Sequence, residues 1–387
     1  MRSEYDVIIA GGGFSGLFCA RELSNRSLSV KIIEDHNKIG YPNKCSGVVS
    51  LNSLNELGVF PKEKFVQNSF SKIMFFSPGN RHIMLNLGSK KILVLDRFAL
   101  DNYLAEEAVK KGAELSIGTK VRDISQDKSS VMAMLPEGNT IHSKYLIDAR
   151  GVASSPKKFT LYSGAQVHGL YKNFESDVIN IFFDTRLASG FFAWIIPINE
   201  YVAKIGLASK VNPLEHLRLF LDKIEVKNTS KLVIAPILVG GAIKNFVDNR
   251  ILYVGDSAGQ TKPTTGGGIY LGGSASILAS EAISKKIEDH SITLVEEYEK
   301  RWFSKFRREI ELMKIFRGYY ERMKNKDMEK LFALIESSYS KEVNLNLDYD
   351  LHISSLIRIL GLKSVSSIFF SLFGNAIKES LGRLIRQ

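Results

Sequence analysis

The sequence has little cysteine and no pattern typical of a metal site. Cys19 and Cys45 are the two cysteines among 387 residues, and they form no CxxC pair. This count excludes a disulfide framework and a cysteine-based redox or metal motif. The seven histidines show no HxH or HExxH spacing, so we expect no metal.

The sequence also lacks a long hydrophobic run. No stretch reaches the roughly 18 apolar residues of a membrane-spanning helix, and the apolar segment 191–198 is short and contains Pro197. The chain places Glu4 and Asp6 in front of its first apolar run, unlike a secretory signal peptide. We therefore expect a cytoplasmic protein that contacts the inner face of a membrane peripherally at most.

Charge of one sign is not concentrated anywhere in the chain. Lys and Arg number 52 against 41 Asp and Glu, which gives a net charge of +11 spread along the sequence. A solvated basic surface is the simplest explanation, although it also suits an anionic partner. We expect no nucleic-acid partner. With 44% hydrophobic and 24% charged residues, the composition is typical of a folded protein.

A glycine-rich motif lies near the N-terminus. Residues 5–10 read as a buried strand, GGGFSG follows at 11–16, a helix runs to about residue 25, and residues 29–34 form a second strand. This order is typical of a dinucleotide-binding βαβ unit. The motif predicts a phosphate site where the helix begins.

The geometry of such a turn gives each glycine a reason. Gly11 allows the tight turn, Gly13 lets backbone N–H groups approach a pyrophosphate, and Gly16 allows the helix to pack closely on the strand. Glu34 ends the second strand and would accept hydrogen bonds from an adenosine ribose. Its charge would repel a 2′-phosphate, so FAD or NAD is favoured over NADP. The alternative is a glycine turn without a ligand.

A second glycine-rich turn lies near residue 260. A predicted strand at 250–254 is followed by GDSAG at 255–259 and by GGGI at 266–269, which opens a helix to about residue 285. Asp256 can bind ribityl hydroxyls, and the helix dipole from Gly267 onward can stabilise negative charge on a reduced flavin.

The segments between the two turns favour FAD over NAD. A simple NAD dehydrogenase would continue with alternating strands and helices, whereas residues 70–95 and 113–149 read as short strands with turns. The two turns would then bind opposite ends of one long dinucleotide.

Four motifs resemble a known family. GGGFSG with Glu34, LDRFALDNYL at 95–104, LIDARG at 146–151 and VGDSAGQTKPTTGGGI at 254–269 resemble the p-hydroxybenzoate hydroxylase type of FAD-binding flavoprotein. Within that group, GYPNKCSGVVS at 40–50 and FFAWIIP at 191–197 resemble the geranylgeranyl reductase family, including archaeal digeranylgeranylglycerophospholipid reductases.

The resemblance implies a flavin site that uses both turns. Arg97 opens a predicted helix and could meet ribityl or phosphate oxygens bidentately, with a surface cation as the alternative. Val121 would act through its backbone at the adenine. The candidate FAD-binding residues are Gly11, Gly13, Ser15, Gly16, Glu34, Cys45, Ser46, Val48, Arg97, Val121, Asp256, Gly267, Gly268 and Ile269.

The two cysteines are expected to play different parts. Cys19 falls within the first helix and reads as a buried small hydrophobe, whereas Cys45 lies in a loop and is the candidate catalytic residue. An inert structural thiol is the alternative for Cys45. The candidate substrate-binding residues are Phe192, Trp194 and Pro197, with ordinary sheet core as their alternative explanation.

The resemblance implies an FAD-dependent reductase that saturates C=C bonds of geranylgeranyl (isoprenoid) chains of membrane lipids or their precursors. Such a reaction adds a hydride and a proton to an unactivated alkene, and Cys45 would donate or position the proton. The external reductant would be NADPH, NADH or a ferredoxin-like partner. The alternatives are an FAD-dependent monooxygenase on an apolar substrate and a non-catalytic flavin electron carrier.

The order of the motifs predicts the architecture. We expect an α/β fold with an α+β insertion, in which a Rossmann-like FAD-binding domain combines residues 1–150 and 240–290. An antiparallel-sheet substrate domain would occupy 151–239, and a helical C-terminal region 291–387. Residues 351–387 are apolar on one side and basic on the other, so they would contact an anionic membrane or cap the flavin domain.

Overall fold

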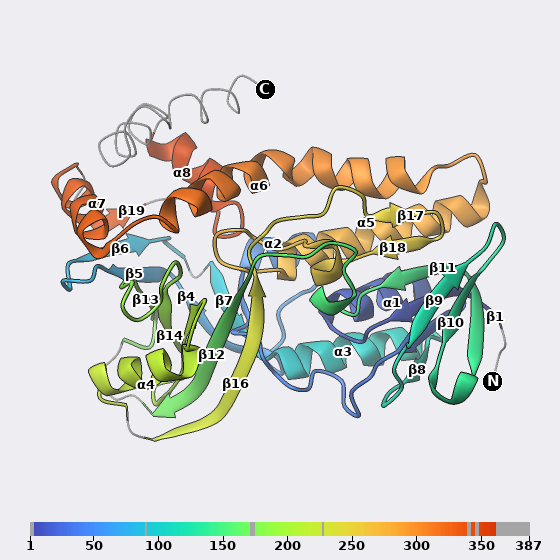
Figure 1. The fold of residues 1–387 in the computed structure, drawn as a ribbon, viewed down its shortest axis with the longest axis horizontal. Coiled ribbons are helices and arrows are strands. Elements are labelled where there is room, and N and C mark those ends of the chain that lie inside the picture. Colours follow the sequence, from blue (N-terminus) through green and yellow to red (C-terminus); the bar gives the residue numbers. More distant parts are fainter. Residues whose placement is uncertain are drawn as a thin grey trace. The chain divides into compact units, whose positions relative to one another are not determined.

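The computed structural model describes residues 4–89, 91–170, 175–226, 228–338, 342–344 and 348–360, and Figure 1 shows its fold. Contacts divide the chain into two compact units. The first comprises residues 1–43, 96–160 and 238–307, and the second comprises 44–95, 161–237 and 308–387. Residues 44–95, which the sequence assigns to the cofactor domain, therefore pack within the second unit. The predicted division into three functional domains stays a prediction.

The first unit is built on a sheet with a parallel centre. Its strands, in spatial order, are β17 (Val247–Asp248), β18 (Ile251–Tyr253), β11 (Thr140–Asp148), β1 (Glu4–Ala10), β2 (Val30–Ile33) and β8 (Glu114–Ser116). All neighbours from β18 to β8 pair in parallel. Residues 7–10 of β1 are fully buried, as expected for a central parallel strand covered on both faces. The strands predicted at 5–10, 29–34 and 250–254 are confirmed.

An antiparallel extension and a set of helices complete the first unit. β9 (Asp123–Gln126) and β10 (Val131–Met134) extend the sheet from β11. The helix α1 (Phe14–Ser24) packs against α3 (Arg97–Lys110) and α5 (Ile269–Glu288). Small side chains allow this packing: the Ser276 hydroxyl donates to the Ser15 carbonyl at 2.9 Å, and Cys19 is fully buried, as predicted.

The second unit is built on a mainly antiparallel sheet. Its strands, in spatial order, are β16 (Thr229–Leu238), β12 (Leu161–Leu170), β15 (Val202–Ser209), β14 (Ala193–Pro197), β13 (Val178–Phe182), β5 (Lys72–Phe76), β6 (His82–Asn86) and β19 (Glu342–Asn344). The pairs β13–β5 and β19–β6 are parallel. The sequence places the sheet between residues 151 and 239, and the structure adds strands from both flanking segments.

The two faces of this sheet carry different residues because successive side chains of a strand point to opposite faces. On one face, Ile195 and Ile205 belong to a buried cluster with Phe220 of α4 (Pro213–Lys223). By alternation, Trp194 of β14 and Lys204 of β15 lie on the other face. One face of this sheet therefore packs an apolar core against α4, and the other face carries Trp194 and Lys204.

The second unit also contains a small sheet and a helix. β3 (Val48–Ser50) and β4 (Val66–Phe70) both pair antiparallel with β7 (Ile92–Leu95). The Ser50 side chain caps the helix α2 (Leu51–Glu56) by accepting the Ser53 N–H. The loop that carries Cys45 leads directly into β3.

The C-terminal region is helical, as predicted. The π-helical turn η4 (Val295–Lys300) continues into α6 (Arg301–Tyr320), which is followed by α7 (Asn325–Ser338) and α8 (His352–Leu360). Among the described residues, no helix combines the length and the apolar character needed to span a membrane. Residues 361–387, which hold most of the predicted basic amphipathic tail, lie outside the described residues.

Candidate functional site

The first glycine turn has no room for larger residues at two positions. Gly11 has φ +106°, and a Cβ atom on it would lie 2.4 Å from the carbonyl oxygen of Ala149, which follows β11. A Cβ atom on Gly16 would lie 2.0 Å from the carbonyl oxygen of Gly11. Both distances are far below van der Waals contact, so the tight turn and the close helix packing require glycine.

Gly13 differs from its neighbours because it faces open space. It is exposed, and a Cβ atom on it would meet no atom within 4 Å. Gly13 is also the N-cap of α1, and no side chain caps this helix. The first N–H groups of a helix have no acceptor within the helix, so this end of α1 offers donors and a positive dipole end to an anion.

Glu34 lies directly beside the turn. Its side chain is about nine-tenths buried, and one carboxylate oxygen accepts the N–H of Gly12 at 2.5 Å. The other oxygen accepts the backbone N–H of His36 at 3.0 Å and lies 2.5 Å from Nδ1 of the same residue. The acidic group predicted to bind a ribose is therefore held at the turn by two neighbours.

His36 contacts Glu34, although no sequence motif indicates this residue. Its Nδ1 also lies 2.9 Å from Asp35, so Glu34, Asp35 and His36 bring three metal-ligand types together. The hydrogen bonds between the histidine and the two carboxylates account for this arrangement without an ion. A histidine two residues after the strand carries no sequence signal that separates it from an ordinary loop residue.

The second glycine turn touches the first at Ser15. Gly255 opens that turn with φ +73°, and the Ser15 hydroxyl oxygen lies 2.6 Å from where a Cβ atom on Gly255 would stand. The same oxygen lies 2.7 Å from the corresponding position on Gly272 of α5. The structure therefore brings together two turns that are 240 residues apart in sequence, counted from Ser15 to Gly255 (255 − 15).

Asp256 lies in this second turn. Solvent reaches its side chain, yet the surrounding protein raises the pKa of its carboxyl, an effect that the Arg97 charge opposes. One Asp256 carboxylate oxygen would lie 3.5 Å from a Cβ atom on Gly268, the N-cap of α5, which also has no side-chain cap.

Lys262 is a second residue of the candidate site that no sequence motif indicates. It is buried, with an exposed fraction of 3%. Its side chain runs against the start of α5, because a Cβ atom on Gly267 would lie 2.7 Å from Cε and 3.3 Å from Nζ. An ammonium and the positive end of the α5 dipole therefore lie at one place. Such a site favours negative charge on a bound group.

Arg97 and Val121 lie in the first unit, and each makes hydrogen bonds to another residue of that unit. Arg97 is the first residue of α3, and its guanidinium contacts both carboxylate oxygens of Asp101 at 3.0 Å. This ion pair is mostly buried, which differs from an exposed helix cation. The Val121 side chain is buried, and its carbonyl accepts from Arg150 at 3.4 Å.

Cys45, Ser46 and Val48 belong to the second unit. The half-buried Cys45 sulfur accepts the N–H of Gly47 at 3.3 Å. Gly47 has φ +79°, and a Cβ atom on it would lie 2.2 Å from the carbonyl oxygen of Leu95. Val48 opens β3 opposite Val94 of β7. The thiol therefore lies on a loop whose backbone is closely fixed.

The aromatic segment also lies in the second unit. Trp194 is largely buried on β14, donates from its indole nitrogen to Gln166 at 3.1 Å and covers Gly206 of β15. Phe192 precedes the strand and stacks on Phe191 with ring centroids 4.4 Å apart. Pro197 ends the strand. Phe192 and Trp194, whose ring centroids are 6.1 Å apart, form an apolar wall on the face opposite α4. By alternation, Pro197, which pairs with Ala203, lies on the α4 face instead.

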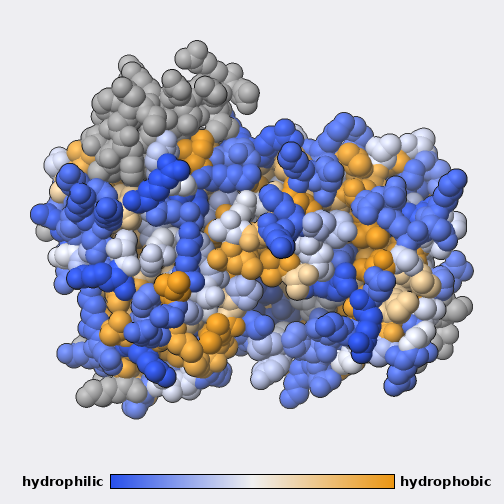
Figure 2. Space-filling model, viewed as in Figure 1, coloured by the Kyte–Doolittle hydropathy of each residue, from blue (hydrophilic) through white to orange (hydrophobic). Residues whose placement is uncertain are grey.

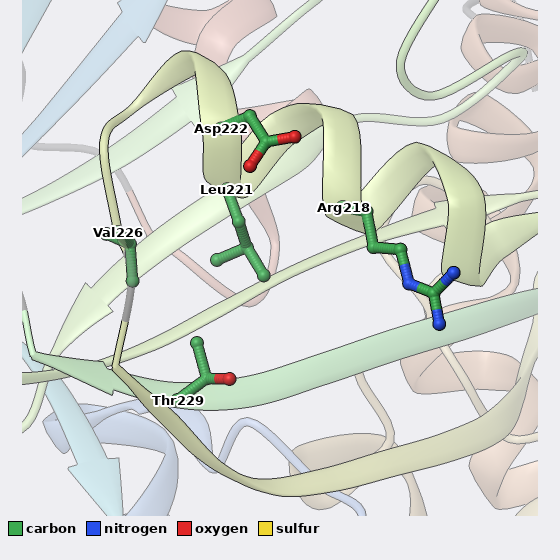
Figure 3. A pocket seen from close by; sticks show the side chains of 5 residues that line it. All are labelled: Arg218, Leu221, Asp222, Val226 and Thr229. Carbon is green, nitrogen blue, oxygen red and sulfur yellow. The ribbon is translucent and has the colours of Figure 1, made fainter.

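A pocket elsewhere in the second unit involves none of the predicted site residues. Figure 3 shows its lining, in which Arg218, Leu221 and Asp222 come from α4, Val226 follows α4, and Thr229 opens β16. Apolar side chains also gather over β16 in Figure 2, where Leu232 and Ile234 are exposed. The pocket carries charges of both signs, so it has no marked preference for an anionic or a cationic ligand. On the edge strand β16, Pro236 has no N–H group to donate to an added strand.

The residues of the first unit fit a dinucleotide. Two helices begin without side-chain caps at adjoining turns, a fixed carboxylate stands beside one turn, and the Asp256 carboxylate lies beside the N-cap of α5 at the other. A pyrophosphate suits the former and hydroxyl groups suit the carboxylates. The FAD contacts of individual residues stay predictions.

Comparison with known proteins agrees with this geometry. A family described as "Lycopene cyclase protein" matches residues 6–337. The digeranylgeranylglycerophospholipid reductase of Methanocaldococcus jannaschii is 28% identical over 367 residues, which cover 87% of this chain and 92% of the relative. Digeranylgeranylglycerophospholipid reductase 2 of Methanothermobacter thermautotrophicus is 28% identical over 385 residues, which cover 92% of this chain and 99% of the relative.

Solved structures show the same fold. A geranylgeranyl bacteriochlorophyll reductase-like protein from Thermoplasma acidophilum matches with a TM-score of 0.85 at 20% identity and covers 99% of both chains. A p-nitrophenol 4-monooxygenase from Pseudomonas putida matches with a TM-score of 0.69 at 15% identity, covering 97% of this chain and 100% of that one. The predicted fold class and the predicted resemblance are confirmed.

Proposed function

This chain belongs to the lycopene cyclase protein family, and from that membership and its two joined glycine turns we propose that it is an FAD-dependent reductase that saturates C=C bonds of geranylgeranyl chains. Relatives named digeranylgeranylglycerophospholipid reductase, which cover most of the chain, support a lipid or lipid-precursor substrate. The main observation that supports FAD as the cofactor is the contact of Ser15 with the Gly255 turn. This contact brings together two turns that each lead into a helix without a side-chain cap.

The first unit would hold the cofactor. The N–H groups at Gly13 would bind the pyrophosphate, Glu34 the ribose and Asp256 the ribityl hydroxyls, while Lys262 and the start of α5 would face the end of the flavin that becomes negative. When bound and reduced by the external donor, FAD would supply the hydride for one carbon of the alkene. A carboxylate at Glu34 would exclude an NADP-type 2′-phosphate.

The second unit would hold the proton and the hydrocarbon. The Cys45 sulfur accepts the Gly47 N–H, so the S–H proton is not used in that bond and is available for the second alkene carbon. Hydride and proton together add two hydrogens across the double bond, and no other atom is transferred. Phe192 and Trp194 would bind the prenyl chain and exclude water, which an unactivated alkene requires.

A monooxygenase is the second candidate function because its fold matches that of p-nitrophenol 4-monooxygenase. Reduction and oxygenation give different products. The test is anaerobic reduction of the FAD-loaded protein, addition of a geranylgeranyl lipid and mass spectrometry. A gain of two hydrogens per bond is expected, whereas a gain of one oxygen in air without hydrogenation would replace the proposal. Flavin that oxidises and reduces without changing any prenyl lipid would favour an electron carrier.

The partners and the location of the enzyme are also part of this proposal. NADPH, NADH or an acidic ferredoxin-like protein would supply electrons, and the net charge of +11 suits an anionic donor. The protein would work in the cytoplasm with peripheral contact at the inner face of the membrane. Comparing the rate of flavin reduction by NADPH, NADH and a ferredoxin tests the choice, and loss of rate at high salt would show that charge attracts the donor.

A further inference from the structure

A buried lysine lies on the face of the second sheet that carries Trp194. Lys204 of β15 has an exposed fraction of 1%, and its ammonium donates to the carbonyl oxygens of Ser46 at 2.8 Å and Leu95 at 3.2 Å. Burying an ammonium is unfavourable unless its hydrogen bonds are made. The position is therefore explained by what the ammonium binds rather than by packing alone.

The two carbonyl groups belong to the backbone that fixes the Cys45 loop. Ser46 follows Cys45 directly, and Leu95 ends β7. The N–H of Leu95 donates to the Gly47 carbonyl at 2.9 Å, and the N–H of Gly47 donates to the Cys45 sulfur. The ammonium thus joins both sides of a loop that holds the thiol, at oxygens that lie beyond the last residue pair of the β3–β7 ladder.

The same lysine fixes this loop relative to the aromatic strand. In the antiparallel register of β14 and β15, Lys204 stands opposite Ile196 and Gly206 stands opposite Trp194. Residues two apart on a strand lie on one face, so Lys204 reaches the Cys45 loop from the face that Trp194 occupies. Its two hydrogen bonds therefore connect the thiol loop with the apolar wall.

We propose that Lys204 is the positioning residue of the Cys45 thiol, because it holds the thiol loop against the Trp194 face. This inference rests on the proposed function, in which Cys45 gives a proton to a hydrocarbon bound at that face. Lys204 itself transfers no proton. Its contribution is to keep the sulfur at one place while the prenyl chain binds.

The test measures how fast Cys45 reacts with iodoacetamide in flavin-free protein. Met keeps the length and the apolar stem of lysine but has no donor, so K204M is expected to raise the alkylation rate about tenfold, the equivalent of one lost hydrogen bond to a charged group. K204R keeps the donors and is expected to stay near the wild-type rate. C45S reports the background from Cys19, whose burial raises the pKa of its thiol to about 12.

A wild-type alkylation rate in folded K204M would overturn the inference. If K204M does not fold, K204Q and K204R form the test, because glutamine is too short to reach both carbonyl groups and arginine is not. Equal thiol reactivity in K204Q and K204R would then contradict the anchoring. A purely structural lysine would lower the melting temperature without changing the alkylation rate of the folded fraction.

Turnover separates this inference from the proposed function. In FAD-loaded protein, K204M is expected to lower kcat for the prenyl lipid, because Lys204 no longer holds the Cys45 loop. If K204M raises the alkylation rate of Cys45 but the wild type reduces no lipid, only the proposed reductase function is rejected. Lipid reduction by the wild type with unchanged kcat and thiol reactivity in K204M would reject the anchor alone.

Discussion

The Ser15 hydroxyl oxygen lies 2.6 Å from the position that a Cβ atom on Gly255 would occupy. This contact joins the start of α1 to the turn that leads into α5, and neither helix has a side-chain cap. Uncapped N–H groups at two adjoining helix ends favour a ligand with several negative or polar groups. The contact therefore places the two turns side by side, as the proposed FAD site requires.

Gly11 and Gly13 offer a matched pair of substitutions. G11A would place a Cβ atom 2.4 Å from a backbone oxygen at φ +106°, and we expect it to lower the free energy of unfolding by about 3 kcal/mol. G13A meets no atom and should cost about 1 kcal/mol or less. Its methyl group would stand in the path of the pyrophosphate, so FAD affinity should fall at least about tenfold. Urea unfolding and FAD titration measure both effects, and normal FAD binding by G13A would contradict the phosphate site.

Glu34 and Asp35 form a second pair. E34Q replaces an anionic acceptor that holds the Gly12 N–H by a neutral amide, and we expect FAD affinity to fall about tenfold because bonds to charged groups are stronger. D35N changes an exposed carboxylate one residue away and should leave the affinity unchanged. Isothermal titration with FAD measures both variants. Equal losses in the two would show that general charge, and not the ribose contact, is responsible.

Asp256 should make the stability of the flavin-free protein depend on pH. Burial raises the pKa of this carboxyl above its ordinary value of 3.8, so the folded state resists an ionisation that the unfolded chain undergoes. The carboxyl therefore lowers stability as pH rises from 3.8 toward the raised pKa, and the loss is constant above it. D256N should be more stable than wild type near neutral pH, and the gain should vanish below 3.8.

Urea unfolding across this pH range measures the gain. D222N, on the exposed side of α4, is the matched control. If D256N gave the same difference at every pH, ionisation of Asp256 would not be its cause. D256N should also weaken FAD binding, because an amide accepts hydrogen bonds from hydroxyl groups less strongly than a carboxylate.

Lys262 should raise the reduction potential of bound FAD. Its ammonium lies at the start of α5, and positive charge there stabilises the reduced, more negative flavin. K262M should lower the midpoint potential by on the order of 30 mV, a tenfold change in a two-electron equilibrium, and K262R should lower it less. Equilibration with reference dyes measures the shift. An unchanged potential in K262M that still binds FAD would remove Lys262 from the flavin site.

The first turn could be predicted from the sequence because its determinants are local. The buried strand, the glycine spacing and Glu34 all lie within residues 5–34, and steric contacts of Gly11 and Gly16 explain the spacing. The second turn has the same local signal in residues 250–269. Both patterns can be read within a short stretch of sequence. The helices predicted after the two turns therefore agree with the observed helices, which begin at Phe14 and Ile269.

Lys204 could not be found in this way because its partners are distant. Ser46 and Leu95 lie 158 and 109 residues away in the chain, and a lysine within a strand reads as an ordinary solvent-facing position. The parallel pairing of β13 with β5 is similarly remote, and it moves residues 72–86 into the second unit. Phe192 shows a local limit, since the strand begins at Ala193, two residues after the aromatic run that starts at Phe191.

Cys45 should be required for proton delivery, whereas Cys19 should not. C45S replaces the thiol by a much weaker acid, and we expect the rate of lipid reduction to fall by about 100-fold or more, the usual contribution of a general acid. C19A changes the buried thiol of α1 and should lower stability while leaving the turnover of folded enzyme intact. Single-turnover reoxidation of reduced enzyme by a geranylgeranyl lipid measures both variants, and full activity of C45S would make water or another group the proton donor.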